Sequence, residues 1–257
     1  MSVLTCSKVD VQIAGIRVAH DLDLEIEPGQ FWGLLGPNGI GKTTLLKCLA
    51  GLEHPAAGEV LLESRDLNAL PRKLLARHIG MLQQHTVYVF DSSVIQTVLT
   101  GRHPHLAYWE REGAKDLEKA REALKAVGLE GFSARSVTGL SGGEARRLAF
   151  AALLVQEPEI MLLDEPTNHL DLRHQVEIMG MIHRRTHRET CSAFAALHDI
   201  NLAARYCSHV LMLFGDGDWC AGRTGDMLNE TSLERLYHCP VERIESANGP
   251  RFHPSAV

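Results

Sequence analysis

Paired cysteines, a long apolar run and a block of basic residues are all missing from this sequence. Its six cysteines, at positions 6, 48, 191, 207, 220 and 239, lack the close spacing of a zinc site or disulfide framework, so we expect reduced cysteines in a cytosolic protein. No stretch approaches the ~20 apolar residues that span a bilayer, and the N-terminus lacks the pattern of a secretory signal. With a net charge of −6 and no basic cluster, the chain is not expected to bind nucleic acid.

The apolar residues that are present alternate between strand-like and helix-like spacing. With 257 residues, the chain is long enough for one large domain or a domain with an insertion. Short apolar runs predict strands at 9–13, 19–26, 31–35, 58–62, 79–82, 160–163, 191–197, 210–214 and 218–221. Helical spacing predicts helices at 43–50, 71–77, 172–188 and 228–237. This order predicts an α/β fold, a mixed sheet with parallel strands and flanking helices and an antiparallel N-terminal β part.

The stretch from about His85 to Glu157 is helical in character. Its periodicity predicts helices at 93–100, 114–127 and 142–155. We therefore predict a core formed by residues 1–84 and 157–257, interrupted by an inserted helical subdomain at 85–156.

A glycine-rich loop connects the strand at 31–35 to the helix at 43–50. Its sequence, GPNGIGKT, fits the phosphate-binding pattern G-x-x-x-x-G-K-[ST], and a strand before it with a helix after it is the context that this pattern requires. Lys42 would reach the β and γ phosphates, while Thr43 would offer its hydroxyl to Mg²⁺. The predicted ATP-binding residues of this segment are Gly36, Pro37, Asn38, Gly39, Ile40, Gly41, Lys42, Thr43 and Thr44.

Two carboxylates follow the apolar strand at 160–163. Because ligands of parallel sheets bind at the carboxyl ends of the strands, Asp164 and Glu165 are expected at the same edge as the phosphate loop. We expect Asp164 to hold Mg²⁺ through water and Glu165 to orient and polarise an attacking water. The alternative is a strand that simply runs into a solvated turn. Two acids beside a phosphate loop make this alternative less favoured.

A serine and two glycines stand at the start of the helix at 142–155. Ser141, Gly142, Gly143 and Glu144 form a helix cap with exposed N–H donors, and taken alone they would be no more than a cap. Together with the phosphate loop and the two carboxylates, they resemble the signature of the ABC ATPases. The resemblance covers about residues 3–240 and implies a P-loop NTPase core of ABC type that binds and hydrolyses ATP with Mg²⁺.

Further positions match motifs of this family. Gln84 matches the Q-loop glutamine, which contacts Mg²⁺ and the water in the family, with Gln83 as the adjacent alternative. His198 matches the switch histidine that donates to the γ phosphate, and Asp171 lies in a segment similar to the D-loop. The resemblance thus implies Glu165, His198 and Gln84 as catalytic residues and Thr43, Gln84 and Asp164 as the Mg²⁺ site.

The sequence departs from the family pattern at the expected contact with adenine. Family members often stack an aromatic side chain on adenine from the early strands, but residues 11–18 contain none. We expect Ile13 or Val18 to supply only apolar contact there.

The resemblance also implies partners. The phosphate loop and the signature of one ABC chain face away from each other, so ATP would lie between Gly36–Thr43 of one chain and Ser141–Gly143 of a second, in a head-to-tail homodimer. The membrane-spanning part would be a dimer of separate permease chains. The protein would then be peripheral, on the cytoplasmic face of the inner membrane.

The sequence around Gly101 narrows the transporter class. Gly101–Arg102–His103–Pro104–His105 is similar to a Gly-Arg-Tyr-Pro-His pattern in ATPases of importers for iron siderophores, haem and cobalamin, with His103 in place of the aromatic residue. This implies an importer with a periplasmic or surface substrate-binding protein. We expect the surface from Gln84 to Trp109 to receive the permease, with Arg102 as a contact whose charge reversal uncouples transport.

Two other functional classes of ABC protein remain open for this sequence. A soluble ABC ATPase of iron-sulfur assembly would share the three ATP motifs, although the Gly101–His105 segment disfavours it. An exporter subunit is the second alternative.

Overall fold

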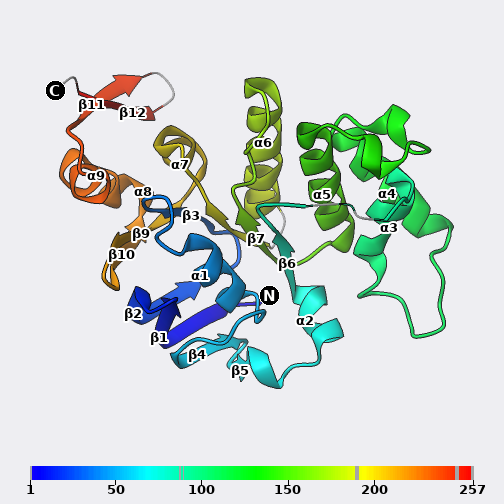
Figure 1. Ribbon diagram of the computed structural model, residues 1–257, viewed down its shortest axis with the longest axis horizontal. Helices are drawn as coiled ribbons and strands as arrows, with labels where there is room; N and C mark the ends of the chain where they lie inside the picture. The colour runs from blue at the N-terminus through cyan, green and yellow to red at the C-terminus, as the bar shows by residue number, and fades with distance from the viewer. Residues whose placement is uncertain (1, 87, 89, 189–190, 247–248, 256–257) are drawn as a thin grey trace.

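The computed structural model describes residues 2–86, 88, 90–188, 191–246 and 249–255, and a mixed sheet forms its centre (Figure 1). Within these residues the sheet has six strands in the order β10-β9-β3-β8-β7-β6. All neighbours are parallel except β10 and β9. The strands are β3 (Phe31–Leu35), β6 (Ile79–Leu82), β7 (Ile160–Asp164), β8 (Ser192–Ala196), β9 (His209–Gly215) and β10 (Asp218–Arg223). Every residue of β3, β7 and β8 is buried, as expected for parallel strands covered on both faces.

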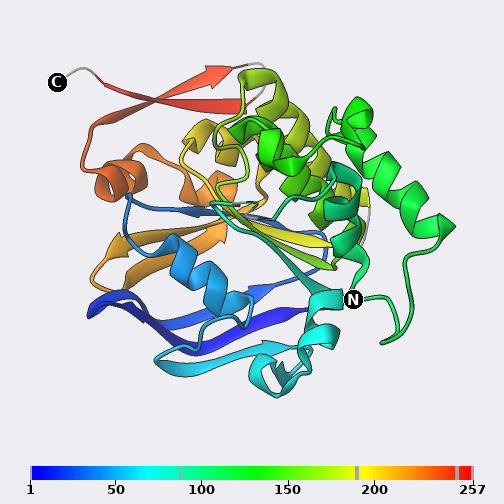
Figure 2. The ribbon, with the colours of Figure 1, turned by 45° about the vertical axis from the view of Figure 1, so that its right-hand side comes forward.

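A second, antiparallel sheet comes from the N-terminal part of the chain. It contains β2 (Ile16–Ile26), β1 (Leu4–Ile13), β4 (Ala57–Leu62) and β5 (Arg65–Asp66) in that order. Helix α1 (Lys42–Leu49) contacts β1 on one side and β7 on the other, so it lies between the two sheets (Figure 2). One apolar cluster joins this sheet, α1 and one face of the six-stranded sheet, and it fixes the start of α1 relative to both.

A helical segment, defined here as residues 91–156, lies to one side of the sheet (Figure 1). Its helices α3 (Val94–Leu99), α4 (Ala114–Ala126) and α5 (Gly142–Gln156) contact one another, and α5 also contacts β6. A second apolar cluster runs from these helices to the other face of the six-stranded sheet. The remaining elements are α2 (Arg72–His78), α6 (Leu172–Arg188), α7 (Ile200–Tyr206), α8 (Thr224–Met227), α9 (Glu230–Tyr237), β11 (Val241–Ser246) and β12 (Gly249–Pro254).

The predicted α/β architecture is confirmed: the chain has a mixed sheet with parallel strands, flanking helices and an antiparallel N-terminal part. Five elements were not predicted from the sequence: α7, α8, β5 and the two strands of the hairpin β11–β12. Four of the six residues of β11 are exposed, so the strand lacks an alternating apolar face. The hairpin is held on α7 instead by the amide of Asn201, which bonds both N–H (2.8 Å) and C=O (3.1 Å) of Phe252.

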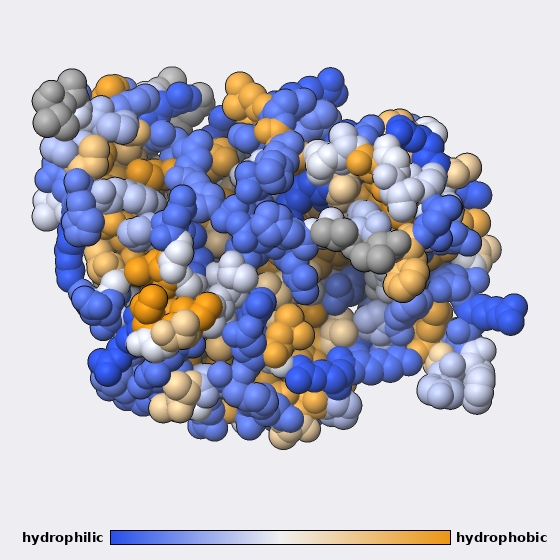
Figure 3. All heavy atoms as spheres, viewed as in Figure 1, coloured by the Kyte–Doolittle hydropathy of each residue, from blue (hydrophilic) through white to orange (hydrophobic). Residues whose placement is uncertain are grey.

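Hydrophilic side chains cover most of the face shown in Figure 3, with apolar residues in small separate groups. None of the helices in the described part of the chain combines the length and the apolar character needed to cross a membrane.

The structure contradicts the expected role of Arg102 as a surface contact. Its side chain is buried, with 8% of the residue exposed. The guanidinium bonds Asp116 (2.8 Å), Glu157 (2.9 Å) and the carbonyl of Val155 (3.0 Å). Arg102 therefore ties the connection after α3 to α4 and to the end of α5, and it presents no charge to a partner protein.

Charge reversal at Arg102 should destabilise the chain. In Arg102→Glu a third carboxylate would lie beside Asp116, which would lose its arginine partner, and Glu157, which would keep Lys119. Breaking a buried ion pair costs about 3–5 kcal/mol. Urea unfolding should show this loss in the free energy of unfolding. The matched control is Arg121→Glu on the exposed side of α4, expected within about 0.5 kcal/mol of the unchanged protein. Equal stability of both variants would show that the buried ion pairs do not hold the segment.

Candidate functional site

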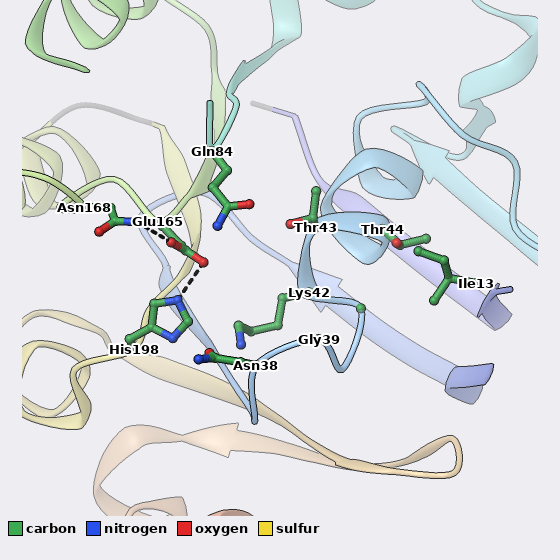
Figure 4. A pocket seen from close by; sticks show the side chains of 11 residues that line it. Ile13, Asn38, Gly39, Lys42, Thr43, Thr44, Gln84, Glu165, Asn168 and His198 are labelled. Atoms are coloured by element: carbon green, nitrogen blue, oxygen red, sulfur yellow. Dashed lines mark hydrogen bonds and ion pairs between the residues drawn. The ribbon is translucent and has the colours of Figure 1, made fainter. Parts of the chain in front are cut away.

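The carboxyl ends of four parallel strands meet at one edge of the sheet. Gly36 follows β3, Gln84 lies two residues after β6, Glu165 follows β7, and His198 lies two residues after β8. A cavity of about 490 Å³ opens at this edge (Figure 4). It is lined by Ile13, Asn38, Gly39, Gly41, Lys42, Thr43, Thr44, Gln84, Glu165, Asn168 and His198. The fold therefore brings the predicted phosphate loop, Q-loop glutamine, second carboxylate and switch histidine to one cavity.

The phosphate loop takes its shape from glycine. Gly41, directly before α1, has a φ of 105°, and a Cβ there would lie 2.4 Å from a methyl group of Val18. Only glycine fits both demands. The loop thus turns tightly into α1, whose N-terminal N–H groups and dipole give the cavity positive potential.

Val18 supports the loop and does not face the cavity. It is fully buried beneath Gly41, so of the two residues expected to supply apolar contact to adenine, Val18 does not reach the cavity. Ile13 lines the cavity and is 43% exposed, and Figure 4 shows it beside Thr44 at the opposite end from Glu165.

Lys42 points back over its own loop. Its Nζ donates to the carbonyls of Gly36 (2.7 Å) and Pro37 (3.0 Å), and only 6% of the residue is exposed. Burial lowers the pKa of the Lys42 ammonium, although Glu165 and Asp164 favour its charged form. A buried cation that donates to neutral carbonyls is a strong binding group for an incoming phosphate.

Thr43 and Asp164 form the part of the site that fits a magnesium ion. The Thr43 hydroxyl donates to the Asp164 carboxylate over 2.7 Å, and the amide of Gln84 faces the same cavity. Burial raises the pKa of Asp164, and the hydrogen bond from Thr43 and the nearby cations only partly offset that. Hydroxyl, carboxylate and amide oxygens are the ligands that Mg²⁺ prefers, so these residues fit the ion.

Both oxygens of Glu165 are engaged by neighbouring side chains. Its Oε1 lies 2.6 Å from Nε2 of His198, and its Oε2 accepts from the amide of Asn168 over 2.8 Å (Figure 4). Burial raises the pKa of Glu165, but hydrogen bonds from His198 and Gln84 outweigh it and hold the pKa below its usual value. Glu165 is thus ionised and oriented, in a left-handed backbone conformation with a φ of 50°.

Asn168 was not among the predicted site residues. The signal that could have identified it is its position three residues after Glu165.

The signature residues are absent from the lining of this cavity. Ser141 and Glu144 form a reciprocal cap on α5: the Ser141 N–H donates to Glu144 over 2.7 Å, and the Glu144 N–H donates to the Ser141 hydroxyl over 3.3 Å. Gly142 lines a separate cavity of about 190 Å³. Asp171 accepts hydrogen bonds from the N–H and the ring of His174.

A strand–phosphate loop–helix unit, two carboxylates at the end of the neighbouring strand and a capped helix on a separate segment together define a P-loop nucleotide-binding protein of ABC type. Residues 19–168 match the family described as "ABC transporter". The chain belongs to this family.

Named relatives add detail. The chain is 38% identical over 238 residues to the cobalamin import ATP-binding protein BtuD of Halobacterium salinarum, covering 93% of this chain but 59% of that protein's length. It is 37% identical over 220 residues to the ferric enterobactin transport ATP-binding protein FepC of Escherichia coli, covering 86% of this chain and 81% of FepC. A dimeric post-hydrolysis structure of the ATP-binding cassette MJ0796 with ADP and Pi superposes with a TM-score of 0.74 at 26% identity, covering 86% of this chain and 98% of that one.

Proposed function

We propose that this chain binds ATP with Mg²⁺, hydrolyses it, and thereby powers the import of a metal chelate (a ferric siderophore, haem or cobalamin) through a separate membrane permease. The observation that carries the ATPase activity is the cavity that holds Lys42, Thr43 and Glu165 together at one sheet edge. The import class is supported by the similarity to BtuD and FepC and by the Gly101–His105 pattern.

The residues of the cavity divide the chemistry between them. The N–H groups of the phosphate loop and Lys42 bind the β and γ phosphates. Thr43, Asp164 and Gln84 would hold Mg²⁺, which neutralises charge on the phosphate oxygens. Glu165 orients the attacking water and His198 donates to the γ phosphate. Hydrolysis then depends on positioning and electrostatics rather than on a covalent intermediate.

His198 and Asn168 each bond one oxygen of the carboxylate that we assign to the attacking water. A carboxylate oxygen can accept a second hydrogen bond, so these neighbours hold Glu165 in place and leave it able to accept from a water. A γ phosphate would offer His198 a further acceptor beside Glu165.

The catalytic unit is proposed to be a head-to-tail homodimer. Ser141, Gly142, Gly143 and Glu144 lie outside the cavity of their own chain, so in this assignment they contact the ATP held by the partner. Asp171, exposed near this surface, would take part in the contact as the D-loop. We also propose the division into a core of 1–84 and 157–257 and a helical subdomain of 85–156.

The permease is proposed to bind beside Gln84. A second cavity of about 340 Å³ lies next to this residue, lined by β6, the following loop and helices α3 and α5. Tyr108 and Trp109, at the end of the Gln84–Trp109 stretch, are 86% and 89% exposed. The protein would lie on the cytoplasmic face of the inner membrane, with a periplasmic or surface substrate-binding protein supplying the cargo.

Copurification tests the transport assignment. Tagged Glu165→Gln protein, incubated with ATP in detergent-solubilised membranes, should recover a polytopic permease, because slowed hydrolysis prolongs the closed state. Lys42→Ala is the control, since loss of the phosphate-binding cation should abolish the effect of ATP on recovery. Uptake of labelled ferric siderophore, haem and cobalamin would then identify the cargo. Recovery of soluble partners alone would move the assignment to an assembly-type ATPase, and outward transport would indicate an exporter.

A further inference from the structure

Helix α5 carries a buried arginine in its first turns, directly behind the ATP cavity. Only 4% of Arg146 is exposed. Its Nη1 donates to the carbonyls of Gln83 and Gln84, the latter over 3.2 Å. Its Nη2 donates to the carbonyls of Asp164 and Glu165, the latter over 2.6 Å. One guanidinium therefore joins α5 to the loops that follow β6 and β7.

The need to fill the core does not explain why an arginine is buried at position 146. Taking a cation out of water is costly, and burial lowers the pKa of Arg146 to about 10 despite Asp164 and Glu165 nearby. Among the described residues its Nε has no hydrogen-bond partner. A leucine or methionine would fill the volume without these costs, but only a planar fork of donors can bind two backbone segments at a fixed spacing.

The carbonyls that it binds belong to residues of the catalytic site. Glu165 is in the left-handed region, a conformation that persists in a non-glycine residue only where its surroundings impose it. The hydrogen bond to the Glu165 carbonyl supplies such a constraint. The contacts with Gln83 and Gln84 place the backbone of the Q-loop relative to the same side chain.

We propose that Arg146 is a positioning residue that fixes Glu165 and Gln84 relative to helix α5, whose N-terminus carries Ser141. A shift of α5 on dimer closure would then move the carbonyls of both loops and set the carboxylate and the amide in their working positions. The inference rests on the proposed ATPase activity and extends it to a residue that does not touch nucleotide.

Two variants separate this role from a purely structural one. Arg146→Met removes the donors but keeps most of the length, and Arg146→Lys keeps the charge but cannot span both loops. Both should lower kcat by about 10–100-fold, because a misplacement of about 1 Å can cost on the order of 100-fold. Binding of a fluorescent ATP analogue to the phosphate loop should change less than about threefold, because Lys42 and Thr43 keep their contacts.

The matched control is Arg102→Gln. Arg102 is also buried in the helical segment, but it bonds Val155 at the far end of α5 from the ATP cavity. This variant should lower the free energy of unfolding with kcat per folded molecule unchanged. Wild-type kcat in folded Arg146→Met, or in Arg146→Lys should the methionine variant not fold, would overturn the proposal. A wild-type protein that binds ATP but does not hydrolyse it would instead overturn the proposed function.

Discussion

Glu165→Gln should lower the rate of ATP hydrolysis by about 10²–10⁴-fold, the range for removing a positioned general base. Glutamine has the same shape but cannot take a proton from the attacking water. The phosphate loop is untouched, so ATP should still bind. Closed dimers should therefore accumulate, visible as an ATP-dependent increase in size by gel filtration, while phosphate release gives the rate.

A matched control is Glu177→Gln on the exposed side of α6, where the carboxylate only pairs with Arg173 one helical turn away. It should hydrolyse ATP at the normal rate. Normal turnover in Glu165→Gln would remove this residue from the base role. A variant that neither hydrolyses ATP nor dimerises with it would point to a damaged binding site instead.

Local patterns in the sequence were enough to predict that several of the candidate residues lie at one edge of the sheet. Gly36, Gln84, Glu165 and His198 are far apart in the chain, yet each follows a strand of the same parallel sheet. Strands that run the same way end at one edge, so recognising the strands was enough to place these residues together.

Contacts between side chains far apart in sequence could not be predicted. Arg102 follows a glycine and precedes a proline two residues later, which is typical of a surface turn. Its actual partners, Asp116 and Glu157, lie 14 and 55 residues away and become neighbours only when α4 and α5 pack. Arg146 was missed for the same reason, since its acceptors are backbone carbonyls of two other loops.

Two inactive variants should restore activity when mixed, if each ATP lies between two chains. Lys42→Ala alone should lose phosphate binding, and Ser141→Arg alone should block the opposite site with a bulky cation while its own phosphate loop stays intact. A mixed dimer then contains one intact site, formed by the phosphate loop of the Ser141→Arg chain and the signature of the Lys42→Ala chain. Its other site carries both defects.

The rate of ATP hydrolysis, measured at different mixing ratios of the two variants, should therefore be highest near equal amounts. Its maximum should be about a quarter of the wild-type rate, because about half of randomly formed dimers are mixed and each mixed dimer has one of its two sites intact. Ser141→Ala is the steric control: it loses the hydroxyl but adds no bulk, so it should lose less activity than Ser141→Arg. Activity that never rises above that of the separate variants would contradict the head-to-tail arrangement. Because Ser141 lies outside the cavity of its own chain, only a site shared between chains explains a rescue by Lys42→Ala.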